Sequence, residues 1–263
     1  MRNLLLLCCL VLGTSGVLAN EQDNLEVSPA LTPSITDNTR QLLRVGMIDF
    51  PPYSFLDETG QPAGMFIPLI NKIAEKAGYQ TEYLVLPIAR LVQNLQDGTV
   101  HIWPGVEGKP ELAEHTWVSR QLLGYVSINL YFRDGTPAPA WPEDLRHENL
   151  IMLTGYDYWP SLFAVIDNPA NGIRVQRTHS HRGAIGMLER NRARFLLNYG
   201  APMQQALRMR PDLKLNNKPL HWVPLRMIVS RQSSMGSQSL LEKLDLSYQE
   251  LMEEGEDLSL PSI

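Results

Sequence analysis

The sequence predicts an α/β protein of two lobes, each a mainly parallel sheet flanked by helices. Two observations carry this prediction. Apolar runs of strand length alternate with segments in which apolar residues recur at helical spacing. The alternation occurs twice, and the second round begins with a strand-like segment that is followed by a proline-rich turn at residues 134–142. Two such units in one chain imply a cleft between them, where small ligands usually bind.

The first 19 residues have the pattern of a secretory signal peptide. Arg2 is followed by the apolar run Leu4–Leu12 and by small residues up to Ala19, after which we expect cleavage. A retained membrane anchor is the alternative, but the run is well short of the ~20 apolar residues of a spanning helix. We therefore expect an exported protein that loses Cys8 and Cys9 with its leader and has no direct membrane insertion.

Without the leader the chain has 244 residues, of which 22 are basic and 28 acidic. This length fits one large domain or two lobes. Mild acidity without a basic cluster argues against nucleic acid or an anionic membrane as a partner. The remaining chain has no cysteine, which excludes disulfides and a thiol nucleophile. Residues 20–41 are polar and aperiodic, so we expect a flexible N-terminal segment before the fold begins at Leu42.

The first half reads as strand, helix, strand, helix, strand, with Gly78 and Gly98 ending the two helices. The expected elements, in that order, are Leu43–Ile48, Phe66–Ala77, Tyr79–Leu86, Ile88–Gln96 and Val100–Trp103.

The second half repeats the alternation and ends in an amphipathic helix. Its expected strands are Tyr125–Phe132, Leu150–Leu153, Arg194–Asn198 and Trp222–Val229. Its expected helices are Pro160–Ile166, His179–Arg190, Met203–Met209 and Ser237–Met252.

Five segments of the first half match a known pattern in register: Leu43–Gly46, Phe50–Phe55, Asp57–Gly64, Ile73–Gly78 and Leu95–Val100. They resemble the family 3 extracellular solute-binding proteins, the periplasmic receptors of amino-acid-type ABC importers. The resemblance implies the type II periplasmic binding protein fold, in which two lobes close around a small solute. On this basis we expect residues 42–124 in lobe 1, residues 125–221 in lobe 2, and residues 222–263 returning to lobe 1. The two crossings are expected near Ser119–Gly124 and Pro219–Trp222.

The chain departs from the family at the positions that hold an amino acid. Members that bind amino acids have an arginine shortly after a Thr-Pro-Glu motif, whereas the segment Lys109–Leu112 has Leu112 at that place. They also have an acidic residue at the end of a second-lobe strand, whereas Arg194–Gly200 ends without an acid. The acidic pair of a third family motif is replaced by Phe66 and Pro68. These departures from the family pattern argue against an ordinary α-amino acid as the solute.

Arg90 opens the helix that follows the second strand, where a side chain in this fold points toward the cleft. Its guanidinium could hold a carboxylate through two parallel hydrogen bonds and replace the missing arginine. The alternative is a solvated arginine at a helix start.

Strand ends supply the other first-lobe candidates, because α/β proteins hold ligands at the carboxyl edge of the sheet. Asp49, Phe50 and Tyr53 follow the first strand, and their carboxylate and rings could contact an amine or an apolar group. Trp103 and Glu107 follow another strand end. Any of the aromatic residues could instead pack in the core.

In the second lobe, Gly155, Tyr156 and Asp157 lie in a turn between a strand and a possible helix, where backbone amides can hold an anion. Tyr156 and Tyr199 could close over a ligand or pack the second core. His179 and His181 are two residues apart and would not face each other, so we expect no metal site. We also expect no cofactor.

We therefore expect a monomeric periplasmic protein that captures a small polar solute, amino-acid-like or another carboxylate or amine compound, for an ABC-type importer. Its expected partners are the solute and a membrane permease or receptor. One alternative is an enzyme on the same scaffold, such as a dehydratase, with Asp49 and Glu107 as proton donor and acceptor. Another is an extracytoplasmic sensor subunit that signals to a membrane receptor.

Overall fold

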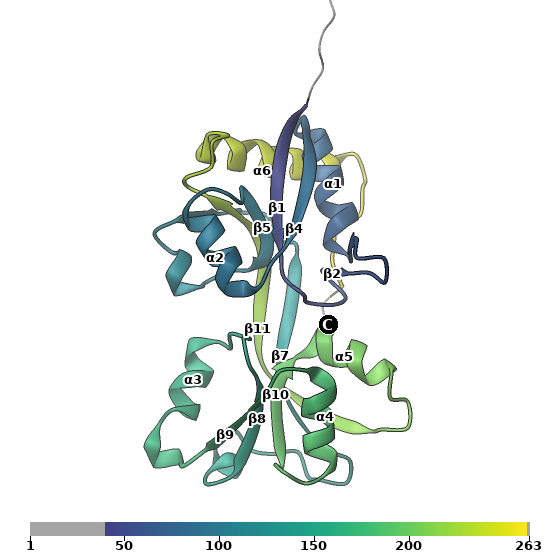
Figure 1. Ribbon diagram of the computed structural model, residues 1–263, viewed down its shortest axis with the longest axis vertical. Coiled ribbons are helices and arrows are strands. Elements are labelled where there is room, and N and C mark those ends of the chain that lie inside the picture. Colours follow the sequence, from purple (N-terminus) through teal and green to yellow (C-terminus); the bar gives the residue numbers. More distant parts are fainter. Residues whose placement is uncertain (1–39, 262–263) are drawn as a thin grey trace, which may run out of the picture. The chain divides into compact units, whose positions relative to one another are not determined.

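The computed structural model describes residues 40–261 and confirms the α/β class with two lobes (Figure 1). The predicted signal peptide and most of the predicted N-terminal segment lie outside the described residues. The first strand begins at Gln41, two residues before its predicted start at Leu43 and at the last residue of the segment predicted to be flexible. Within residues 40–261, no helix has the length and apolar character needed to cross a membrane.

The first lobe is built around strand β1 (Gln41–Met47), which lies between β4 (Tyr79–Val85) and β5 (Ile102–Val106) and is parallel to both. Helices α1 (Phe66–Lys76) and α6 (Ser237–Glu253) pack on one face of this sheet. Helix α2 (Ile88–Gln96) packs on the other face. The two-sided cover explains why β1 and β5 are mostly apolar, whereas the edge strand β4 alternates with polar residues.

The second lobe has the same plan. Strand β8 (Asn149–Leu153) lies between β10 (Phe195–Tyr199) and β9 (Arg174–Thr178), and all three are parallel. Helix α3 (Pro160–Ile166) packs on one face, while α4 (His181–Glu189) and α5 (Gly200–Arg208) pack on the other.

Two antiparallel strands join the lobes into one mixed sheet (Figure 1). Strand β11 (Leu215–Ser230) pairs with β5 of the first lobe and with β7 (Gly124–Arg133), and β7 pairs with β10 of the second lobe. The sheet order is β4-β1-β5-β11-β7-β10-β8-β9. Each lobe is therefore mainly parallel, as predicted, and the two antiparallel strands lie in the middle.

Short elements complete the fold. Strand β6 (Thr116–Val118) pairs with β11, and β2 (Phe55–Leu56) pairs with β3 (Pro62–Ala63). The 3-10 turns are η1 (Pro110–Leu112), η2 (Glu143–Leu145) and η3 (Pro169–Asn171).

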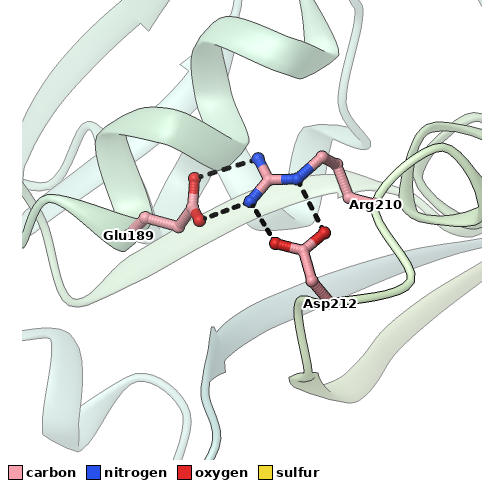
Figure 2. A network of polar contacts seen from close by, with 3 residues as sticks. All are labelled: Glu189, Arg210 and Asp212. Carbon is pink, nitrogen blue, oxygen red and sulfur yellow. Dashed lines mark hydrogen bonds and ion pairs between the residues drawn. The ribbon is translucent and has the colours of Figure 1, made fainter.

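An ion-pair network fixes the turn between α5 and β11 (Figure 2). Arg210 Nη2 lies 2.8 Å from Glu189 Oε1 at the end of α4 and 2.9 Å from Asp212 Oδ2. The guanidinium also holds the pKa of Asp212 below its usual range through a direct hydrogen bond. Because the network is exposed, it positions the chain entering β11 more than it stabilises the fold.

Helix α2 packs tightly on β1 because β1 has a glycine at the contact. A Cβ atom at Gly46 would lie 2.3 Å from Leu91 Cδ1 and 2.9 Å from Val100 Cγ1. Leu91 is fully buried and belongs to an apolar cluster that also contains Leu95 and Trp103. This cluster supports the end of β5, where the cleft begins.

We predict that Leu91→Ala destabilises the protein by about 2–5 kcal/mol, because it leaves a cavity between α2 and β1. Leu246→Ala serves as the matched control, since Leu246 is 55% exposed on α6, and it should change the stability by no more than about 0.5 kcal/mol. Urea unfolding measures both variants. Equal losses in the two variants would contradict the packing described for α2.

Candidate functional site

Three aromatic side chains meet between the lobes. Phe50 comes from the turn after β1, whereas Tyr156 follows β8 and Tyr199 ends β10. The Phe50 ring lies 5.2 Å from the Tyr199 ring in an edge-to-face arrangement and 6.0 Å from the Tyr156 ring. Such aromatic pairs contribute roughly 0.5–1.5 kcal/mol beyond the burial of their area. The cluster therefore holds the two lobes against each other.

An inner cavity of about 40 Å³ lies beside this cluster. A cavity needs roughly 10–15 Å³ for one water molecule, so the inner cavity has room for only a few. Its walls include Ile48, Phe66, Ile88 and Leu225, together with Trp103 from β5. The inner cavity is mainly apolar, and the three rings of the aromatic cluster form part of its wall.

Lys109 and Asp157 form an ion pair across the cleft. Lys109 Nζ lies 2.5 Å from Asp157 Oδ2 and 4.0 Å from Glu111 Oε1. The Lys109 side chain is 6% exposed, whereas that of Asp157 is 53% exposed. A buried ammonium that loses its partner carries a large desolvation cost. Lys109 therefore needs an anion at this point, and Asp157 supplies it.

The ion pair also separates the inner cavity from an outer cavity of about 330 Å³. Both cavities are lined by Val106, Lys109, Asp157 and Tyr199. The outer cavity lies within the range of roughly 300–1,000 Å³ that is typical of small-molecule sites.

Two further contacts position the second-lobe side of the cleft. The Tyr199 hydroxyl donates to the backbone oxygen of Asp157 at 2.5 Å, which fixes the turn that carries the carboxylate. The Trp159 ring stacks on His221 of β11 with the ring centroids 4.7 Å apart. Gly108 has φ 81°, and a Cβ atom there would lie 2.9 Å from Trp159 Cη2. A glycine at this position allows the first-lobe loop to approach the indole closely.

A chain of hydrogen bonds orients the Tyr156 hydroxyl. The Tyr199 backbone N–H donates to Asn198 Oδ1, which leaves Asn198 Nδ2 to donate to His181 Nδ1 at 3.0 Å. Burial lowers the pKa of His181 to about 4, so the ring is neutral near pH 7 and has its proton on Nε2. That N–H donates to the Tyr156 oxygen at 3.0 Å. The Tyr156 O–H is therefore left to donate to another acceptor.

The structure brings together six of the predicted binding residues. Those that line the inner cavity are Phe50, Trp103, Gly155, Tyr156, Asp157 and Tyr199. Glu107 lines the outer cavity, where its carboxylate lies 2.7 Å from Arg226 Nε. A Cβ atom at Gly105 would lie 2.1 Å from Trp103 Cε2, so a glycine is needed where the indole folds over β5.

The other three predicted residues line neither cavity. Tyr53 is fully buried, is stacked on Phe66, and donates its hydroxyl to the Pro261 backbone oxygen at 3.1 Å. Arg90 is exposed on α2. Asp49 lies just after the end of β1 and is exposed as a whole. Its carboxyl is nevertheless partly desolvated, which raises the pKa of that group. The Asp49 charge in turn contributes to a raised pKa of the Tyr156 hydroxyl, whose main cause is burial.

The predicted binding residues did not include Lys109 or His181. Lys109 lies three residues after the end of β5. The sequence predicts cleft residues at the ends of strands, so this position fits that rule. In the sequence, His181 is a candidate only for a metal site, and its bond to Tyr156 depends on how α4 packs beside β8. Only the position of Lys109 could therefore have been found from the sequence.

A comparison with protein families matches residues 43–258 to the bacterial extracellular solute-binding proteins, family 3. The match covers most of the chain, and the chain belongs to this family. The family binds small-molecule solutes, so a cleft between two lobes is its expected binding site. No curated protein sequence matched the chain.

Solved structures with the same fold include several ligand-binding proteins. An ancestral arginine-binding protein bound to arginine is 22% identical with a TM-score of 0.67, over 82% of this chain and 95% of the other. A histidine kinase sensor domain similar to periplasmic binding proteins is 20% identical with a TM-score of 0.67, over 83% and 93%. The GluR0 ligand-binding core in complex with L-glutamate is 18% identical with a TM-score of 0.64, over 81% and 93%. At these identities the likeness establishes the fold.

We predict that acid destabilises the protein through His181. Because the folded-state pKa of about 4 lies below the ordinary 6.5, the unfolded chain binds more protons between these values. The contribution of His181 to the free energy of unfolding should therefore be fully present above about pH 6.5. It should be lost as the pH is lowered toward about 4. His181→Gln should reduce this slope, measured by urea unfolding at several pH values.

The control for this prediction is His179→Gln, which changes an exposed histidine two residues earlier. It should leave the slope unchanged. Burial also lowers the pKa of His101 to about 4, so part of the acid sensitivity should remain in His181→Gln. A slope identical to that of the unmodified protein in His181→Gln would contradict the bonding described for this ring.

Proposed function

We propose that the protein captures a small polar solute in the cleft between its lobes and delivers it to an ABC-type importer in the periplasm. The observation that carries the proposal is the Lys109–Asp157 ion pair, which joins the lobes at the boundary of the two cavities. Membership of the solute-binding family supports it. The predicted signal peptide supports the location.

The ion pair favours a solute that carries both a carboxylate and an amine. A solute carboxylate that displaced Asp157 from Lys109 would keep the buried ammonium paired, and a solute amine could then pair with the freed Asp157. No charge would be left without a partner, which is the condition for burying ions at low cost. The Tyr156 hydroxyl, held by His181, offers one further donor.

The same pair accounts for the missing family residues. Leu112, at the place of the family's arginine, is buried in the apolar cluster under α2. Lys109 lies three residues earlier and supplies a positive charge at the cleft instead. Asn198 and Tyr199 occupy the strand end that lacks the family's acid, and Asp157 supplies a negative charge from the adjacent turn. Both charges are thus present at shifted positions, which fits an amino-acid-like solute held in a different orientation.

Binding requires the lobes to separate, because the aromatic cluster and the ion pair close the cleft. Only a solute that contacts both lobes can favour the closed form further. Lys109 contributes from the first lobe and Asp157 from the second, so a solute bound to both would do so.

We predict that one or more members of a panel of amino acids, carboxylates and amines raise the melting temperature of the protein. At a concentration about a hundredfold above Kd, the expected rise is roughly 5–10 °C. Lys109→Met should weaken binding by about tenfold or more, because a charge-assisted hydrogen bond is lost. Thermal melting with calorimetric titration measures both effects.

Lys214→Met is the matched control, since Lys214 is exposed before β11. It should bind the solute as the unmodified protein does. If no member of the panel raises the melting temperature, or if Lys109→Met binds the solute with unchanged affinity, the proposal is wrong.

A sensor role is the second candidate, favoured by the likeness to a histidine kinase sensor domain. It uses the same cleft and differs only in the membrane partner. Cross-linking of the closed protein in its native membrane, followed by mass spectrometry, separates the two roles: a permease supports import, and a signalling receptor supports sensing.

The enzyme alternative assigned acid–base roles to Asp49 and Glu107. Glu107 is engaged by Arg226, and Asp49 lies outside both cavities. This placement favours binding over catalysis. Turnover of the bound solute, lost in a variant with both carboxylates replaced, would support the enzyme instead.

A further inference from the structure

A third cavity lies on the face of the joining strands opposite the main core. Along β7, Val126, Ile128 and Leu130 face the main core, whereas Ser127, Asn129 and Tyr131 alternate with them and face the other way. We call the cavity over these residues the rear trough. Its volume is about 340 Å³, within the range of roughly 300–1,000 Å³ typical of small-molecule sites.

Strand register and a helix define the other walls of the rear trough. Asn217 and Trp222 of β11 pair with Tyr131 and Ser127 of β7, so their side chains share its face of the sheet. Helix α5 lies beside β7 (Figure 1). Its Gln204 also lines the rear trough. The walls contain amides, hydroxyls and apolar groups, and none of the charged side chains within residues 40–261 lines them.

The floor of the rear trough has a buried polar atom without a partner. Asn129 is 6% exposed, and its Nδ2 donates to the Tyr131 hydroxyl at 3.3 Å. Its Oδ1 is buried and accepts no hydrogen bond from any of residues 40–261. Exchanging the oxygen and the nitrogen of the Asn129 amide would leave the nitrogen, instead of the oxygen, without a partner. An unpaired buried amide costs free energy, which a ligand donor would recover.

Trp222 provides the other half of a binding site. It is 47% exposed at the edge of the rear trough, an unusual degree for an indole on a central strand. An exposed ring of this kind can cover the apolar face of a ligand. A ligand for the rear trough must therefore be neutral, carry hydroxyl or amide donors, and present an apolar face. Saccharide rings have all three properties.

We propose that the rear trough is a second ligand site, separate from the cleft, which binds a neutral saccharide. A sugar hydroxyl donates to Asn129 Oδ1, the ring packs on Trp222, and Gln204 bonds a further hydroxyl. None of the residues that line the rear trough lines the inner or outer cavity, so a saccharide bound there does not contact Lys109.

Saturation-transfer difference NMR of the secreted protein tests this site, with N-acetyl-D-glucosamine and methyl β-D-glucopyranoside as probes. At least one probe should show saturable binding. Trp222→Ala and Gln204→Ala should each weaken it by about fivefold or more. Trp117→Ala is the matched control, because Trp117 is a comparably exposed indole on β6, and it should bind the probe normally.

Asn129→Leu should abolish binding. Because this variant alters a buried position, its urea unfolding is measured in parallel. If Asn129→Leu does not fold, Trp222→Ala and Gln204→Ala alone test the site. The proposal is overturned if neither probe binds the unmodified protein, or if binding persists unchanged in Trp222→Ala and Gln204→Ala. It is also overturned if Lys109→Met removes binding, since the probes would then occupy the cleft.

Discussion

The pairing of β11 with both β5 and β7 is the constraint on which the rest of the structure depends. It carries one sheet from the first lobe into the second, so the strand ends of both lobes face the same cleft. Phe50 and Lys109 approach from one side, and Tyr156 and Asp157 from the other. Any movement of the lobes must therefore bend these two strands, which also form the floor of the rear trough.

The cleft is closed by interactions that a solute can replace. The aromatic cluster supplies an apolar wall, and the ion pair supplies one charge of each sign. Tyr199 and His181 fix the two second-lobe groups by hydrogen bonds to the Asp157 backbone and to the Tyr156 hydroxyl. Such preorganisation lowers the entropic cost of binding, because little has to be ordered when the solute arrives.

Most helices and buried strands could be predicted, because their apolar spacing is a local property of the sequence. The first half of β11 was missed, since Pro219 lacks an N–H and the register shifts there, so the prediction started at Trp222. Strand β9 was missed because it is a polar edge strand, Arg174–Thr178, with no apolar pattern. Phe50 and Tyr53 lie in the same turn, yet Phe50 lines the inner cavity and Tyr53 packs in the core. Contacts with distant segments, such as the bond from Tyr53 to Pro261, decide these positions, so the local sequence could not separate them.

We propose that Lys109 and Asp157 exchange their mutual bond for bonds to the solute. A crystal structure of the protein with the solute that binds most tightly tests this exchange directly. The expected structure has a solute anion within hydrogen-bonding distance of Lys109 Nζ, with Asp157 released and turned toward a solute amine. A solute bound in the cleft while the Lys109–Asp157 bond stays intact would contradict it.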